Sequence, residues 1–382
     1  MVKLGISSFG IFLYLIVPTY LLSGGYSFYN FVYMLPIGIY LISIISLKKN
    51  RLSLVWPFKN WNIFFMILLM YSTFYMIFSG GEKSIYETMH IFLGIIIFTL
   101  TISFINDGKR FERLIVIIKL TMLIVIIHSL INFLFDMRIT ASYSNENRLA
   151  SFLVLFMPFI LSEILARKKT FSNVLMVLLV FVVLLLSDAR FNQLGFIVQL
   201  AIFIYFFIRN LKIKKIGYLL PIILMILIVV IPFQFFKVTQ DQYGRNIIEQ
   251  YTNQYSSMNE RTVMIENGFN QFTKNLLLGV GPDQIDTGTN YENFHNFFIQ
   301  LMASYGLIPI IGFIILYFNL FLHYKKLKSD NTSIYSYALI LFLLSFPLIC
   351  LAPSYIFDFR PFYMVFAVFI SLIYINLSKK LD

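Results

Sequence analysis

Two arginines and a histidine are the residues of this chain that could do chemistry, and two of the three lie beside a long apolar run. His295 comes directly before the run that starts at Asn296. Arg190 lies in the short connection S-D-A-R-F-N between two apolar runs, and Arg261 lies in the one long polar interval, about residues 234–306. A guanidinium group matches the oxygens of a phosphate, and an imidazole exchanges protons near neutral pH. These residue types predict an anion-binding site with a base beside it.

The polar interval contains further candidates. Glu292 lies three residues before His295, where its carboxylate could orient the ring and raise its basicity. Gly279 and Gly281, in L-L-L-G-V-G-P, suit a chain reversal, and binding of a phosphate by this single G-x-G is the weaker interpretation. The interval therefore offers a base with its own orienting group.

Three arginines, Arg148, Arg190 and Arg360, could have a structural role instead of binding an anion. Arg190 could pair with Asp188, and Arg360 with a nearby aspartate in A-P-S-Y-I-F-D-F-R-P. Arg148 follows Asn147 at the start of an apolar run, where Asn and Ser are natural helix caps and a long cationic side chain can reach lipid phosphate. An arginine this close to hydrocarbon is usually paired or functional. Binding of an anionic ligand therefore stays open for all three.

The elements that must position these residues are membrane-spanning helices. The chain of 382 residues is 59% hydrophobic and only 13% charged, whereas a soluble domain is about a quarter charged. About 20 apolar residues span the hydrocarbon layer. The sequence predicts an all-α polytopic membrane protein with about twelve transmembrane helices. They lie at about 5–24, 27–47, 61–79, 86–105, 114–135, 149–166, 171–187, 191–208, 216–235, 296–322, 334–352 and 362–377.

Basic residues orient these helices, because Lys and Arg collect on cytoplasmic loops. Most of them fall on the face that also carries both termini, which are predicted to be cytoplasmic. Three segments follow: helices in 1–235, a large extracytoplasmic loop in 236–295, and helices in 296–382. The net charge of +12 reflects this topology and attraction to membrane lipids, and requires no nucleic-acid partner. The single cysteine, Cys350, excludes an internal disulfide.

The large loop has a helical pattern. After possible caps from Ser257 onward, Ile265, Phe269 and Phe272 follow at helical spacing and predict an amphipathic helix. Arg261 lies four residues before Ile265, so we expect it on the same apolar face, pointing toward the protein or the membrane.

Three local patterns resemble the O-antigen polymerase and O-antigen ligase superfamily, of the Wzy and WaaL type. The first is Asn147-Arg148-Leu149-Ala150 at the start of a helix, and the second is Arg190 with Leu194 four residues later. The third is Arg261, a turn N-L-L-L-G-V-G from Asn275 to Gly281, and His295-Asn296 followed by Gly306. Leu276 stands where the family often has Pro, and Pro309 where Gly is frequent. The resemblance covers most of the chain. It rests on the order in which the three patterns occur, because each pattern alone is weak.

The resemblance implies an activity. Members of this family transfer a glycan from a polyprenyl pyrophosphate donor to a sugar hydroxyl outside the cytoplasmic membrane of bacteria. His295 would be the general base on the acceptor hydroxyl, and Arg190 and Arg261 would bind the pyrophosphate. Asn147, Arg148, Asn296, Glu292, Gly279, Gly281 and Arg360 are the predicted substrate-binding residues. No metal or other cofactor is implied, direct displacement would invert the anomeric carbon, and a chain-length regulator and a flippase of the same pathway are possible partners.

Two alternatives remain. A ligase of the same family would pass the finished glycan to a lipid A core, whereas a polymerase, the favoured interpretation, joins lipid-linked repeat units of O-antigen or capsule. A flippase for lipid-linked oligosaccharide would place charged groups near the membrane midplane. Lys119 and Glu163 lie toward cytoplasmic helix ends, where we expect them to be interfacial, so the sequence favours the enzyme.

Overall fold

The computed structural model describes part of the chain, and all its regular structure in that part is helical. Two of the predicted spans, 27–47 and 216–235, lie outside the described residues, and so does the boundary between 235 and 236. The number of twelve helices and the three segments therefore stay predictions. The described residues are 10, 12–22, 59–135, 139–141, 143, 145–166, 170–187, 189–210, 247–289, 294–329, 335–351 and 359–378.

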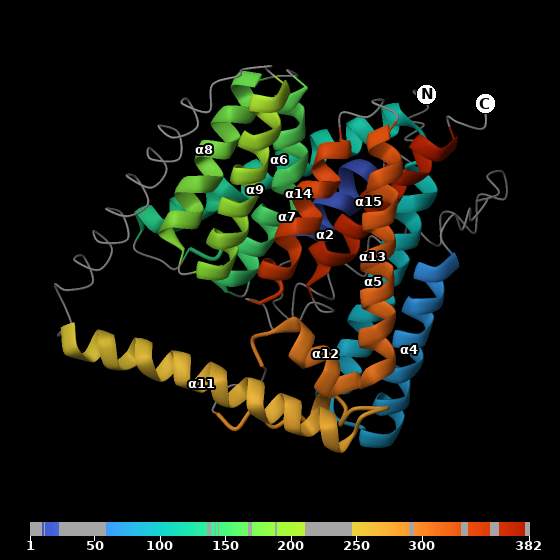
Figure 1. Ribbon diagram of the computed structural model, residues 1–382, viewed down its shortest axis with the longest axis vertical. Helices are drawn as coiled ribbons and strands as arrows, with labels where there is room; N and C mark the ends of the chain where they lie inside the picture. The colour runs from blue at the N-terminus through green and yellow to red at the C-terminus, as the bar shows by residue number, and fades with distance from the viewer. Residues whose placement is uncertain are drawn as a thin grey trace, which may run out of the picture.

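A bundle of apolar helices forms most of the described molecule (Figure 1). Five of its helices, α5, α6, α7, α9 and α13, are long and apolar enough to cross a membrane, and four others contain shorter apolar stretches. The prediction of a helical membrane protein is confirmed to this extent. The elements are η1 (Phe12–Ile16), α2 (Val17–Leu22), α4 (Lys59–Ser79), α5 (Glu82–Phe104), α6 (Gly108–Leu134), α7 (Glu146–Leu165), α8 (Thr170–Leu186), α9 (Arg190–Asn210), α13 (Leu307–Ser329), α14 (Ser336–Ile349) and α15 (Arg360–Ser378).

Helix α7 is the centre of this bundle. Every residue from Leu149 to Ile164 is buried, as expected for a helix that is apolar on all sides. Helices α8, α9 and α14 pack around it. The buried amide of Gln199 on α9 donates to the carbonyl of Val154 (3.0 Å) and to the hydroxyl of Ser345 (2.7 Å), so it joins α9 to both α7 and α14.

A buried ion pair connects α6, α7 and α8 with the residue that precedes α14. Lys119 Nζ on α6 lies 2.6 Å from Glu163 Oε2 on α7. Asn173 on α8 donates to the same oxygen (2.9 Å), and Tyr335, just before α14, donates to the other (3.0 Å). Glu163 is only 6% exposed. The two charged residues therefore pair with each other inside the bundle, near the end of α7, and their expected position at the membrane interface stays a prediction.

Helix α11 (Ile247–Lys274) lies across one end of the bundle (Figure 1), which we call the α11 end. It packs on the short helix α12 (Phe297–Tyr305). The helix itself was predicted, but its buried face only in part: Phe272 is buried and Arg261 faces the protein, as predicted. Met264, Gly268 and Phe272 are buried, whereas Ile265 and Phe269 are about half exposed. The stripe that contacts the protein is rotated by one residue, since Gly268 allows an approach that the larger side chains would block.

The apolar run at 296–322 is broken in two. Gly306 has a positive φ of 77° and separates α12 from α13. A Cβ at this position would lie 2.5 Å from the carbonyl oxygen of Leu277, and the N–H of Leu307 donates to the carbonyl of Leu276 (2.8 Å). The break places α12 at the α11 end, directly after His295 and Asn296.

Candidate active site

His295 is held in a strained backbone conformation at the start of α12. Its φ of 47° lies in the left-handed region, which a non-glycine residue rarely adopts. Asn296 follows as the helix cap, and its side chain accepts from the N–H groups of Phe298 (3.0 Å) and Ile299 (3.3 Å). Strain of this kind costs about 1–3 kcal/mol and is common at functional sites. The structure therefore sets the direction of the Cα–Cβ bond of His295 at a cost in stability.

Arg261 reaches this histidine from α11. The cation acts electrostatically on His295, which is itself partly buried. Burial first, and the nearby guanidinium second, lower the pKa of His295 below its usual value. The ring is therefore neutral at pH 7, and a neutral imidazole can accept a proton.

Phe191 brings the second arginine to the same place. The guanidinium carbon of Arg261 lies 5.3 Å from the centroid of the Phe191 ring, in a cation–π contact. Phe191 is the second residue of α9, and Arg190 is the first and is exposed. Arg261 thus contacts the residue that follows Arg190 and acts on His295, whereas no contact of the Arg190 side chain itself with the other two residues is observed among the described residues.

The start of α7 lies beside the start of α9. Asn192 donates to the backbone carbonyl of Asn147 (3.1 Å) and accepts from the hydroxyl of Ser151 (3.0 Å). Asn145 caps α7 through the N–H of Arg148 (2.9 Å), as the sequence predicted. Since α7 and α9 run in parallel, Arg148 and Arg190 are both in first helical turns at the α11 end.

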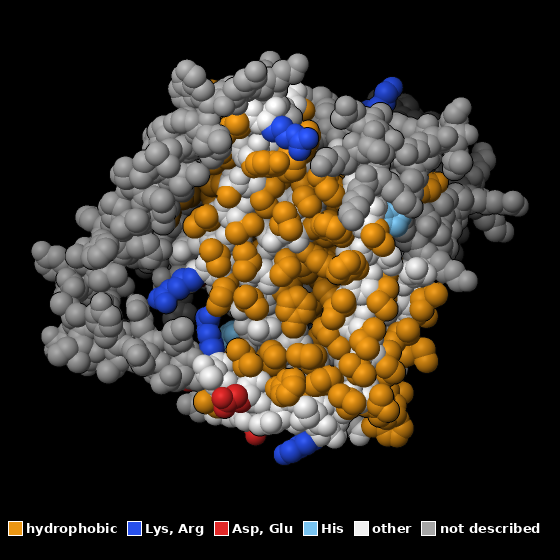
Figure 2. All heavy atoms as spheres, viewed as in Figure 1, with side chains coloured by type: hydrophobic (Ala, Val, Ile, Leu, Met, Phe, Trp, Pro, Cys, Tyr) orange, Lys and Arg blue, Asp and Glu red, His pale blue; other side chains and the backbone are white. Residues whose placement is uncertain are grey.

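Helices α15 and α12 begin in this neighbourhood as well. Phe359 contacts the ring of Tyr143, which precedes α7, at 6.4 Å, and Phe362 contacts the ring of Phe297 at 6.0 Å. The backbone of Arg360 therefore lies near the start of α12. Several helix N-termini, with their partial positive charge, and several arginines share one region. Figure 2 shows basic side chains beside a histidine on the left of the view, at the lower edge of the apolar face. This electrostatic environment favours an anion.

Gly279 and Gly281 have a packing role. Both have positive φ angles, of 74° and 84°, and a Cβ on Gly279 would lie 2.5 Å from the backbone of Ser304. The N–H of Val280 donates to the carbonyl of Ala303 (2.8 Å), and that of Gly281 to the carbonyl of Ser304 (3.0 Å). The predicted chain reversal is present. Because these N–H groups bond α12, the geometry gives no support to the weaker prediction that they bind phosphate.

Asp283 anchors the same loop to the bundle. Its carboxylate accepts from the backbone N–H groups of Lys83 (3.1 Å) and Ser84 (3.2 Å) in the first turn of α5, and from the hydroxyls of Ser79 (2.6 Å) and Ser84. Partial burial alone would raise its pKa, but these hydrogen bonds outweigh it, and the pKa lies below the usual value. A side chain on Gly81 would overlap the carboxylate. This aspartate caps α5 from a distant part of the chain.

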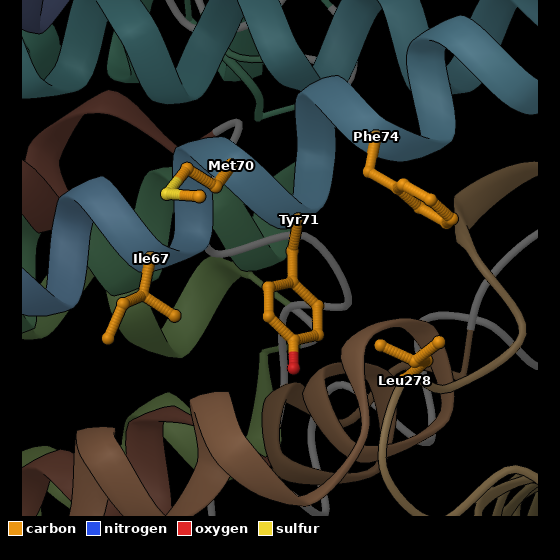
Figure 3. Close-up of a pocket in the computed structure, with 5 residues that line it drawn as sticks. All are labelled: Ile67, Met70, Tyr71, Phe74 and Leu278. Carbon is orange, nitrogen blue, oxygen red and sulfur yellow. The ribbon is translucent and has the colours of Figure 1, made fainter.

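A cavity of about 280 Å³ lies between α4 and this loop, away from the arginines. Its lining is apolar, and Figure 3 shows side chains of α4 projecting toward Leu278 of the loop. None of the predicted site residues lines it. The lining residues are Ile67, Met70, Tyr71, Phe74 and Leu278.

Some site residues could not be placed and others were missed. Glu292 and Asp188 lie outside the described residues, and so does the side chain of Arg360. Phe191 and Asn192 were missed, although both directly follow Arg190. The signal for Asn192 was present, because a buried amide on a membrane helix needs a partner on a neighbouring helix.

Comparison with known proteins finds one family that matches this part of the chain. Residues 174–317 match a family model described as O-Antigen ligase. The match runs from α8 into α13 and includes Arg190, Arg261 and His295, whereas Asn147, Arg148 and Arg360 lie outside it. No curated protein matches the chain.

Proposed function

We infer that this chain, a member of the O-antigen ligase and polymerase superfamily by its match over residues 174–317, is a membrane glycosyltransferase. Its donor is a glycan on undecaprenyl pyrophosphate, and its acceptor is a sugar hydroxyl of a lipid-linked repeat unit. The site faces the extracytoplasmic side of a bacterial cytoplasmic membrane. The observation that supports this is the position of Arg261, which touches Phe191 beside Arg190 and acts on His295.

The arginines account for the anionic part of the donor. As the bond between the anomeric carbon and the phosphate oxygen breaks, its electron pair stays on the pyrophosphate. Arg190 and Arg261 stabilise this charge, together with the N-terminus of α9. Charge stabilisation by groups already in place is often the largest contribution to catalysis. Arg148 and Asn147 lie in the first turn of the neighbouring helix α7, and these two residues and Arg360 are proposed to bind the substrates.

His295 accounts for the acceptor. Its neutral ring takes the proton of the acceptor hydroxyl while the oxygen attacks the anomeric carbon. Because one displacement forms one bond and breaks another, the configuration at that carbon inverts. The lowered pKa keeps the base unprotonated at neutral pH. The left-handed backbone at His295 keeps the ring in position.

The polymerase reaction can be tested with purified protein and the lipid-linked repeat unit from its own gene cluster. Wild type should form a ladder of longer products. His295→Gln should lower kcat by about 10²- to 10⁴-fold, as expected for loss of a general base. Arg190→Ala and Arg261→Ala should each lower kcat by about 10²- to 10³-fold, as for loss of a transition-state donor.

An arginine on α9 and a histidine on α13 provide matched controls. Arg209 is an exposed arginine in the last turn of α9, and His323 on α13 bonds its own helix at Asn319 (2.7 Å). Arg209→Ala and His323→Gln should keep wild-type turnover. If the three site variants also keep it while folded, the proposed site is wrong.

A ligase reaction is the second candidate, because the matching family model is described as O-Antigen ligase. The same preparation is therefore assayed with a lipid A core as acceptor. Transfer of glycan to the core, without a ladder of lipid-linked products, would assign the ligase reaction to the same three residues. Absence of both products would reject the glycosyltransferase proposal.

A further inference from the structure

Gln300 is a buried polar residue that the proposed chemistry does not use. It lies on α12 and is 5% exposed. Its Oε1 accepts from the backbone N–H of Phe294 (3.3 Å), and its Nε2 donates to the hydroxyl of Ser304 (3.2 Å). Phe294 directly precedes His295. The amide therefore reaches from the interior of the helix back to the segment that carries the proposed base.

The left-handed backbone at His295 has to be held from both sides. On the C-terminal side, the side chain of Asn296 caps α12. On the N-terminal side, the ring of Phe294 is 1% exposed and packs with Met264, Ile299 and Ala303. Packing fixes this ring but leaves the N–H of the same residue in need of an acceptor, since a buried N–H without a partner is costly. Gln300 provides that acceptor.

We propose that Gln300 is a positioning residue that holds the backbone before His295, and through it the imidazole ring, in the orientation needed for proton transfer. This inference rests on the proposed function, because it assumes that His295 is the base. Gln300 contacts neither substrate. Its effect is confined to the geometry of His295, while Arg190 and Arg261 keep their places on other helices.

This arrangement predicts that loss of the Gln300 acceptor lowers kcat and leaves KM for the donor unchanged. Without the acceptor, the N–H of Phe294 is buried without a partner and the strained residue after it can relax. A displacement of about 1 Å in a reacting group can lower the rate by about 100-fold. The arginines that bind the donor are unchanged, so its KM should be unchanged as well.

The test compares a substitution that removes the acceptor with one that keeps it. Gln300→Met keeps the length of the side chain but removes the acceptor, whereas Gln300→Glu keeps a carboxyl oxygen for the N–H of Phe294. In the full-length protein, Gln300→Met should lower kcat by about 10- to 100-fold at unchanged KM for the donor. Gln300→Glu should stay within about threefold of wild type by the same reasoning.

Gln199 offers a matched control, because it is also a fully buried amide that bonds two partners inside the bundle. Gln199→Met should lower the melting temperature and leave kcat of the folded fraction unchanged. Ser304→Ala is a second test if Gln300→Met does not fold: it removes the partner that orients the amide, and kcat should fall at unchanged KM. A kcat equal to that of wild type in Gln300→Met would overturn the inference. If Gln300→Met does not fold, a wild-type kcat in Ser304→Ala would overturn it instead. So would an equal loss of kcat in Gln199→Met.

His295→Gln separates this inference from the proposed function. If His295→Gln is inactive and Gln300→Met is fully active, the base is assigned correctly and only the positioning role is wrong. If His295→Gln keeps wild-type turnover, the proposed function of His295 fails, and the role of Gln300 fails with it.

Discussion

At the scale of single residues, the site depends on an arginine and a histidine that act on each other's charge. Burial first, and repulsion from the positive charge of Arg261 second, lower the pKa of His295 and favour its neutral form. The same charge is proposed to bind the donor. The Phe191 ring beside the guanidinium stabilises the cation. A carboxylate in its place would neutralise the charge, whereas the ring does not. One residue can therefore serve both halves of the reaction.

The pH dependence of turnover tests this coupling. His295 is active as the neutral ring, so activity should be lost as the pH falls through its lowered pKa. Arg261→Gln removes one of the two causes of that shift. The pKa of His295 should rise, and the acid limb of kcat/KM against pH should move to higher pH. Lys274→Gln, at the far end of α11, should leave the limb in place. An unmoved limb in Arg261→Gln would show that the two residues do not interact.

At the scale of elements, the contact between α11 and α12 sets the distance from Arg261 to His295. Gly268 is the closest point: a Cβ there would overlap Cγ2 of Ile299 and lie 3.1 Å from the ring of Phe294. Arg261 lies two helical turns before this glycine. A small separation of the helices here therefore moves the guanidinium relative to the ring.

Gly268→Ala should accordingly lower kcat by about 10-fold or more while the bundle remains folded. The clash is with a β-branched methyl group, and this suggests a rescue. Gly268→Ala with Ile299→Leu removes the Cγ2 methyl and should recover most of the activity. Gly268→Ala with Ile299→Val keeps that methyl and should recover none. Equal activity of the two double variants would contradict this account of the interface.

The cap that Asp283 places on α5 has a measurable effect on stability. Asp283→Ala should lower the free energy of unfolding by about 1–2 kcal/mol at pH 7, the usual effect of losing a helix cap. The pKa of Asp283 is lowered in the folded state. Its contribution to the free energy of unfolding is therefore complete above the unfolded pKa of about 3.9. This contribution is lost as the pH falls through the folded pKa. The difference in melting temperature should therefore shrink in acid.

Asp286 is the control for this measurement. Its carboxylate accepts from the N–H of Gly288 (2.8 Å) within the same loop and caps no helix. Asp286→Ala should change the melting temperature little. If both substitutions have equal effects, the cap on α5 is not what stabilises the loop.

At the scale of the whole molecule, the sequence predicted most of the described helices, and it singled out Arg261 and His295, which interact at the α11 end. Apolar length predicts where helices lie because the hydrocarbon layer sets that length. It did not predict the break at Gly306, because α12 and α13 are both apolar and only the approach of Leu277 requires the glycine. The buried face of α11 and the role of Gln300 depend on contacts between distant segments, which no local pattern contains.

The proposed topology can be tested because Cys350 is buried. Lys274 and Arg209 are exposed at opposite ends of the bundle, and cysteines introduced there report the two sides of the membrane. In intact cells, a membrane-impermeant maleimide should label Lys274→Cys. Arg209→Cys should react only after permeabilisation, and wild type should not react. Labelling of Arg209→Cys in intact cells would reverse the orientation and place the candidate site in the cytoplasm.

The buried pair of Lys119 and Glu163 constrains how the chain is made. Helix α6 is synthesised before α7, so Lys119 reaches the membrane before its carboxylate exists. A lone charge within a transmembrane helix opposes insertion by about 2.5–3.5 kcal/mol. The two helices should therefore enter the lipid as a pair. Asn173 and Tyr335 follow later in the chain. The hydrogen bond from Tyr335 to Glu163 can therefore form only when the start of α14 has been synthesised.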